Sequence, residues 1–315
     1  MMECSRHWFP DPVTGAPVEA LRLCSDSVEL TVLPQRALDI YKLRYRNAGI
    51  SYTDLHAKII PEGFCEAGAE NFSAHFFAGM MTTCGLIQAG RPCQENGRSF
   101  GLHGCISNTS ALRVQAETAD DRVTVQGITE EHHPEGEHMH LTRRITLHRD
   151  GWLEIVDTVK NIGGIVTPFM LMYHINFGAP FLSEALQVSI PFTHTEDRDT
   201  GLPAAPAEIL KMESQGAYSR EKVYYTQADM TSGAHLYDPV SGSACRLTAD
   251  GTGWLGIWKN FVDGAYALGI EPCNCPGLGR VNAAKRGLLP FLSPGEARQF
   301  RIRLQFTHHT QEVSP

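Results

Sequence analysis

The chain has 315 residues and a net charge of −8 at neutral pH, with 42% hydrophobic and 20% charged residues. This length suffices for two domains or for one large all-β body. The acidic balance and the lack of a basic run disfavour a nucleic-acid partner, and an acidic surface has no general attraction to anionic membranes.

The N-terminal stretch MMECSRHWFPDPVTG lacks the apolar core of a signal peptide, and the longest apolar stretches are too short to span a bilayer. Nine cysteines occur at irregular spacing, which is typical of reduced thiols. We therefore expect a cytoplasmic protein without membrane contact. The sequence leaves a homodimer open.

Short runs of alternating apolar and polar residues recur along the chain, which is the pattern of half-buried β-strands. Strands are predicted at residues 28–34, 38–52, 111–117, 122–130, 140–148, 152–161, 244–250 and 299–306. Helical periodicity is weak and confined to a short turn near 203–213. The predicted fold is all-β, a large antiparallel β-sandwich forming a single domain over residues 1–315, with its core at about 28–306.

Two long stretches without regular alternation, 60–110 and 175–235, interrupt this pattern. Their composition is not that of linkers, and loops of such length in a compact domain are usually functional. We therefore expect them to contribute to a binding or catalytic site.

Several polar residues stand in apolar surroundings. His103 lies between glycines in SFGLHGCISN, and His174 follows an apolar run in FMLMYHINFGAP, with Asn176 two residues later. Lys259 follows a tryptophan in GWLGIWKNFVDG, and Glu271 ends the alternating run YALGIE just before a loop rich in Pro and Gly. Strand ends that lead into irregular loops are common sites of chemistry.

These motifs, in this order, resemble the galactose mutarotase-like (aldose 1-epimerase) superfamily, in a less characterised bacterial branch. GLHG at 101–104, YHINFG at 173–178 and GIEP at 269–272 are similar to its first histidine motif, its second histidine strand and its late strand ending in a catalytic glutamate. LEIVDTVKNIGG and LSPGEARQFRI are weaker similarities. The resemblance implies a galactose mutarotase-like supersandwich.

The resemblance further implies roles for these residues: Glu271 as general base, His174 as general acid, and His103 and Asn176 as substrate-binding residues. Such an enzyme opens and recloses a sugar hemiacetal by proton transfer, so no metal or organic cofactor is expected. The family's Gly-x-Asp-His stretch is not found. Arg36 and Lys259 are predicted from their positions to supply cationic substrate contacts instead.

Other interpretations stay open. The chain could act on a sugar phosphate or another anionic sugar, or it could be a non-catalytic carbohydrate-binding sandwich. The cluster HHPEGEHMH at 132–140 places two histidines on one strand face, which could bind a metal, but its turn residues favour a solvated hairpin. The sequence does not identify the sugar.

Overall fold

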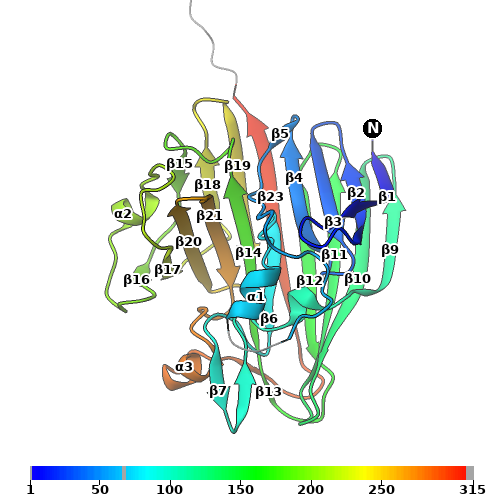
Figure 1. Ribbon diagram of the computed structural model, residues 1–315, viewed down its shortest axis with the longest axis vertical. Helices are drawn as coiled ribbons and strands as arrows, with labels where there is room; N and C mark the ends of the chain where they lie inside the picture. The colour runs from blue at the N-terminus through cyan, green and yellow to red at the C-terminus, as the bar shows by residue number, and fades with distance from the viewer. Residues whose placement is uncertain (1, 66–68, 310–315) are drawn as a thin grey trace, which may run out of the picture.

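A computed structural model describes residues 2–65 and 69–309. Its larger sheet has eleven strands, in the order β1-β2-β3-β4-β6-β14-β21-β20-β17-β16, with β5 paired to β4 (Figure 1). These strands are β1 (Glu3–Pro10), β2 (Pro17–Cys24), β3 (Val28–Leu33), β4 (Asp39–Tyr45), β5 (Ala48–Gly49), β6 (Met81–Leu86), β14 (Met170–Gly178), β16 (His194–Asp197), β17 (Lys222–Gln227), β20 (Trp254–Val262) and β21 (Ala265–Cys273).

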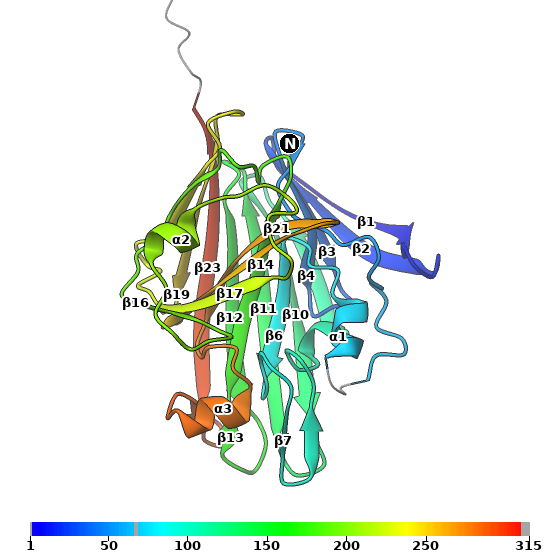
Figure 2. The same cartoon turned by 60° about the vertical axis from the view of Figure 1, so that its left-hand side comes forward.

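The second sheet has eight strands, in the order β15-β18-β19-β23-β12-β11-β10-β9, and lies against the first, as the turned view in Figure 2 shows. It contains β9 (Leu112–Thr118), β10 (Arg122–His132), β11 (His138–His148), β12 (Leu153–Asn161), β15 (Gln187–Ser189), β18 (Ala234–Tyr237), β19 (Ser243–Asp250) and β23 (Ala297–His308). The fold is therefore all-β and built from antiparallel sheets, as predicted.

Short elements connect or flank the strands of the two sheets. They are α1 (Glu70–His75), the 3₁₀ turn η1 (Ile106–Asn108), α2 (Pro206–Leu210), α3 (Arg280–Lys285), and the strand pairs β7 (Cys93–Glu95) with β8 (Arg98–Phe100) and β13 (Thr167–Pro168) with β22 (Phe291–Leu292). In the described part of the chain, no helix has the length and apolar character needed to cross a membrane.

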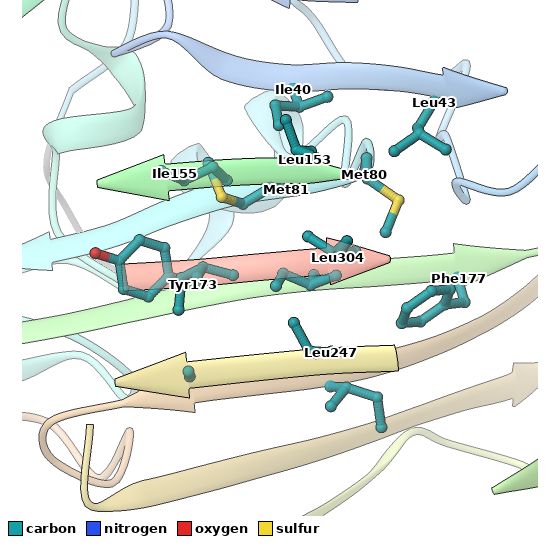
Figure 3. Close-up of a cluster of buried hydrophobic side chains, with 14 of the residues drawn as sticks. Ile40, Leu43, Met80, Met81, Leu153, Ile155, Tyr173, Phe177, Leu247 and Leu304 are labelled. Atoms are coloured by element: carbon teal, nitrogen blue, oxygen red, sulfur yellow. The ribbon is translucent and has the colours of Figure 1, made fainter. Parts of the chain in front are cut away.

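The main core fills the space between the two sheets. Strands such as β11 bury every second side chain there, because successive side chains of a strand point to opposite faces. Figure 3 shows Ile40, Met81 and Tyr173 of the larger sheet facing Ile155 and Leu304 of the smaller one. A one-residue shift of a strand that is solvent-exposed on one face, such as β11, would expose its apolar side chains, so this core fixes its register.

β14 differs from the other strands because all nine of its residues are buried. One face contributes Tyr173 and Ile175 to the main core. The other face, with Met170 and Met172, packs into a second apolar cluster that includes Phe72 of α1. β14 therefore has protein on both faces, and polar side chains on its outer face lie in a protected environment.

Candidate active site

His174 and Glu271 lie on adjacent strands. Ile175 of β14 pairs with Ile270 of β21, so that the antiparallel register sets His174 opposite Glu271. Both side chains point away from the main core, and the Nε2 atom of His174 is 3.2 Å from the Oε1 atom of Glu271. Residues 97 positions apart in the sequence thus form one pair, with exposed fractions of only 4% for His174 and 2% for Glu271.

Two glycines leave space for the Glu271 carboxylate. A Cβ atom at Gly256 of β20 would lie 2.6 Å from Oε2, and one at Gly269 would lie 2.6 Å from Oε1. Any larger residue at either position would displace the carboxylate. Gly256 on the neighbouring strand and Gly269 on the same strand as Glu271 therefore determine the position of the carboxylate.

Asn176 sets the tautomer of His174. Its side-chain NH₂ group donates hydrogen bonds to the carbonyl oxygens of Ala78 and Gly79, both at 3.1 Å. The Oδ1 atom of Asn176 consequently faces Nδ1 of His174, at 2.6 Å. This network assigns the proton of the neutral ring to Nδ1, which leaves the Nε2 lone pair directed toward Glu271.

The environment also determines where the remaining proton of the pair resides. Burial raises the pKa of Glu271 to about 8 and lowers the pKa of His174 to about 4. At neutral pH the carboxyl is therefore protonated and the imidazole is neutral. Oε1 of Glu271 is buried and has no assigned hydrogen-bond partner among the described residues, although it lies 3.2 Å from Nε2 of His174. A buried oxygen of this kind is available to a ligand.

Aromatic rings surround the pair. The ring centroids of Phe76 and Trp258 lie 4.8 and 5.1 Å from that of His174, and the His103 ring lies 5.7 Å from it. Phe72 packs on His103 at 5.0 Å. The third predicted residue, His103, is thus brought to the same cluster as His174 and Glu271, although 71 residues separate it from His174 in the sequence.

His103 lies in a backbone conformation that favours glycine, with φ of +58°. Its Nδ1 atom accepts a hydrogen bond from the Gly90 N–H at 3.3 Å, so the proton of the neutral ring is on Nε2. Burial lowers the pKa of His103 well below its usual value, and the adjacent His174 adds to this effect. His103 is therefore a neutral ring that can donate one hydrogen bond.

A charged group lies next to this cluster. Arg198 contacts Glu221 at 2.9 Å and Asp199 at 2.9 Å, while Glu221 accepts a hydrogen bond of 2.7 Å from the Trp258 indole N–H. The charges of Glu221 and Arg198 both act on the pKa of Glu271, in opposite directions. These residues fall in the irregular 175–235 stretch, where no periodic pattern singles out individual side chains.

Arg36 does not reach the cluster. It is fully buried, and its guanidinium donates hydrogen bonds to Ser107 and to the carbonyl oxygens of Ile59 and His75 at 2.9 and 3.0 Å, and also approaches the Lys58 carbonyl. Its donors are thus directed to protein acceptors. Its position ties the end of α1 to neighbouring loops and does not support the predicted substrate contact.

Lys259 lies on the opposite face of the larger sheet from Glu271. It pairs in register with Leu268, a main-core residue, and its ammonium donates a hydrogen bond of 2.7 Å to the Lys211 carbonyl oxygen. It also lies 3.9 Å from Glu213. The structure therefore does not bring Lys259 to the cluster, and its position gives no support to the predicted substrate contact.

Two groups of side chains in the described residues have the spacing of metal ligands: Cys105 with Glu131 and His133, and Glu130 with His138 and His140. Both belong to or contact the β10–β11 hairpin of the smaller sheet. Neither contains His174 or Glu271.

Solved structures share this fold. A candidate aldose 1-epimerase from Klebsiella pneumoniae aligns with a TM-score of 0.81 at 19% identity, over 93% of this chain and 80% of that one. A galactose mutarotase-like protein from Clostridium acetobutylicum aligns with a TM-score of 0.74 at 14% identity, over 98% and 99% of the two chains. Galactose 1-epimerase from Lactobacillus acidophilus gives 0.68 at 12% identity, over 98% and 100%.

These identities are low, so the similarity establishes the galactose mutarotase-like fold and not an activity. No curated protein matches the chain in sequence. A family model does match, over residues 15–306, and its description is a domain of unknown function, DUF4432. That match covers most of the sequence, and the chain therefore belongs to the DUF4432 family.

Proposed function

We propose that this protein is an aldose 1-epimerase-type isomerase that interconverts the anomers of a free sugar. The observation that carries the proposal is the buried pair of His174 and Glu271, whose facing atoms are 3.2 Å apart and whose pKa values leave the carboxyl protonated and the imidazole neutral near pH 7. Anomer exchange needs one group that takes a proton and one that gives a proton, held side by side.

The reaction follows from this arrangement. The anomeric hydroxyl and the ring oxygen are bonded to the same carbon, so adjacent groups can reach both. The resemblance implied Glu271 as base and His174 as acid, but their pKa values favour the reverse order in the resting pair. Neutral His174 accepts the hydroxyl proton while protonated Glu271 gives its proton to the ring oxygen, and the C1–ring oxygen bond breaks to give the open aldehyde. After rotation about C1–C2, Glu271 takes that proton back and His174 returns the other as the bond reforms. Each residue thus acts once as acid and once as base.

The surroundings fit a sugar. Phe76 and Trp258 offer aromatic faces for the C–H faces of a pyranose, and the Nε2–H of His103 can donate to a sugar oxygen. Arg198 and Glu221 lie beside Trp258 and supply a donor and an acceptor for neighbouring hydroxyls. These two residues take the place of the acid of the missing Gly-x-Asp-His stretch and of the cationic contacts predicted at Arg36 and Lys259.

The alternatives receive less support. An anionic sugar needs unpaired cations, yet Arg198 already contacts Glu221 and Asp199, and Arg91 contacts Asp199 at 2.5 Å. A carbohydrate-binding sandwich without catalysis has no need for a buried carboxyl with an unpartnered oxygen. Anomeric exchange NMR across a panel of neutral aldoses, with and without the protein, tests the proposal; no acceleration of any of them would contradict it.

The pH dependence of kcat/KM is expected to be bell-shaped. Below a pH of about 4 both groups are protonated and no base remains, whereas above about 8 both have lost their protons and no acid remains. The two limbs belong to the pair as a whole, since the groups are coupled. NMR exchange rates measured at a series of pH values from about 3.5 to 9, a range that brackets both pKa values, test the bell shape. A rate that climbs steadily through the upper limb would show that no acid from this pair is needed.

Arg198→Met is expected to raise KM for the best sugar by about tenfold with a smaller change in kcat, because a charge-assisted hydrogen bond contributes about 1.5–3 kcal/mol. The matched control is Arg22→Met, which removes an exposed arginine paired with Glu29. Arg22 lies on β2, near the opposite end of the larger sheet from β16. Steady-state kinetics of both variants measure the changes in KM and kcat separately. Equal KM values in Arg198→Met and Arg22→Met would remove Arg198 from the sugar site.

A further inference from the structure

A cluster of histidines lies on the β10–β11 hairpin, away from the proposed active site. Glu130 pairs in register with His140, and His132 pairs with His138. All four side chains point to the outer face of the smaller sheet, because the intervening residues Met139 and Leu141 are buried in the main core. The predicted turn lies beyond them, so these histidines belong to strands and not to a solvated loop.

The donor atoms converge on one point. The Nε2 atom of His140 is 2.8 Å from Oε1 of Glu130, and Nε2 of His138 is 3.4 Å from Oε2 of the same carboxylate. One donor atom from each residue lies within 4.8 Å of the others. His132 packs against His138 with ring centroids 4.8 Å apart. The side chains of Glu130, His138 and His140 are 28–38% exposed, so an ion in solution can reach them.

We propose that Glu130, His138 and His140 bind a divalent transition-metal ion of the Zn²⁺ type. Two imidazole nitrogens and one carboxylate are a common ligand set for Zn²⁺, whereas Mg²⁺ and Ca²⁺ prefer oxygen ligands throughout. The ion takes the place of the Nε2 protons that now face the carboxylate, and a fourth position stays open to water. His138 and His140 alternate on one rigid strand, which fixes the spacing of the two nitrogens.

The neighbouring group of Cys105, Glu131 and His133 is less suited, because Glu131 already accepts hydrogen bonds from the Leu86 N–H at 2.6 Å and contacts His133 at 3.1 Å.

Metal binding is tested on protein stripped with EDTA and dialysed. Titration calorimetry with ZnCl₂ is expected to show about one ion bound per chain at micromolar affinity, and Co²⁺ is expected to give the visible absorption of a four-coordinate site. His138→Gln/His140→Gln abolishes both signals. Glu130→Gln weakens Zn²⁺ by at least about tenfold, since the loss of a supporting residue alone commonly costs that much.

The matched control is His148→Gln. His148 lies on the same strand and face, but its ring stacks on Trp152 at 4.3 Å and is remote in register from the cluster. This variant is expected to bind Zn²⁺ like the unmodified protein. Absence of binding by the unmodified protein, or unchanged binding by His138→Gln/His140→Gln, would overturn the proposal. If that double variant does not fold, Glu130→Gln serves as the test. An unchanged Zn²⁺ affinity of Glu130→Gln would also overturn the proposal.

Thermal unfolding gives a second measurement. An ion that bridges β10 and β11 binds the folded state preferentially, so Zn²⁺ is expected to raise the Tm of the unmodified protein and of His148→Gln, but not that of His138→Gln/His140→Gln. Anomer exchange is expected to survive EDTA, because His174 and Glu271 lie on the larger sheet and act by proton transfer. Success or failure of the metal site is thus separate from that of the proposed isomerase activity.

Discussion

Glu271→Gln is expected to lower anomer exchange by at least about a hundredfold while the fold persists. Positioned proton transfer contributes on the order of 10²–10⁴ in rate, which corresponds to about 3–5 kcal/mol of barrier. The amide of glutamine fits the space left by Gly256 and Gly269 and can still donate toward the Nε2 atom of His174. The variant therefore removes the transferable proton and little else. NMR exchange on the best aldose measures the loss.

His174→Asn should produce a similar loss, and the double variant should lose less than the sum of the two effects, because the residues act as a unit. Glu29→Gln, which changes a half-buried glutamate of β3, is the matched control and should keep full activity. Circular dichroism and thermal melts establish that each variant is folded. A folded Glu271→Gln protein with near-normal exchange would show that this carboxyl has no part in the reaction.

The strands with clear alternation could be predicted from the sequence. β10 and β11 extend the predicted runs by two residues at one end and β23 by two at each end, whereas β12 begins one residue later than predicted. One face of each strand lies on the core, which produces the alternation. The run predicted at 38–52 is instead broken by a turn between β4 and β5, where Arg46 and Asn47 both have positive φ. β1 and β2, before residue 28, were not predicted.

β14 illustrates what alternation cannot show. Its two faces are both covered, so His174 and Asn176 stand in a continuous buried run, and nothing local distinguishes a satisfied core histidine from a site residue. The neighbouring strand resolves the question: the register with β21 sets Glu271 opposite His174. Cross-strand pairing of this kind depends on the whole fold. In the sequence, the order of the motifs was what indicated that His174 and Glu271 belong to one site.

The face of the sheet on which Lys259 lies could have been predicted by a simpler argument. In a strand, neighbouring residues point to opposite faces. Because Gly256 is the residue opposite Glu271, Trp258 shares the face of the carboxyl and Lys259 does not. Parity within one strand therefore separates the two, whereas closeness in sequence to Trp258 suggested a shared site. Arg198 and Glu221 had no comparable signal, because their contacts join segments that follow no periodic pattern.

A buried ionic network links the two sheets beneath the proposed site. Arg143 of β11 contacts Asp157 of β12 at 2.7 Å and Asp39 of β4 at 3.2 Å, and it donates to Thr83 of β6 at 2.7 Å. The Tyr173 hydroxyl donates to Asp157 at 2.9 Å. Since Tyr173 directly precedes His174 on β14, this network fixes the strand that holds one half of the proposed proton-transfer pair.

Arg143→Met is therefore expected to lower the free energy of unfolding by about 3–5 kcal/mol, because it leaves two buried carboxylates without their cation. The control Arg303→Met removes a half-exposed arginine that contacts Glu154 at 2.9 Å on the smaller sheet, and it should cost no more than about 1 kcal/mol. Urea unfolding monitored by tryptophan fluorescence compares the two. Arg143→Met/Asp157→Asn should recover part of the loss, since it removes one of the unpaired charges and keeps an acceptor for Tyr173. Equal stability of Arg143→Met and Arg303→Met would show that the network does not hold the sheets together, and that the apolar contacts between them suffice to position His174.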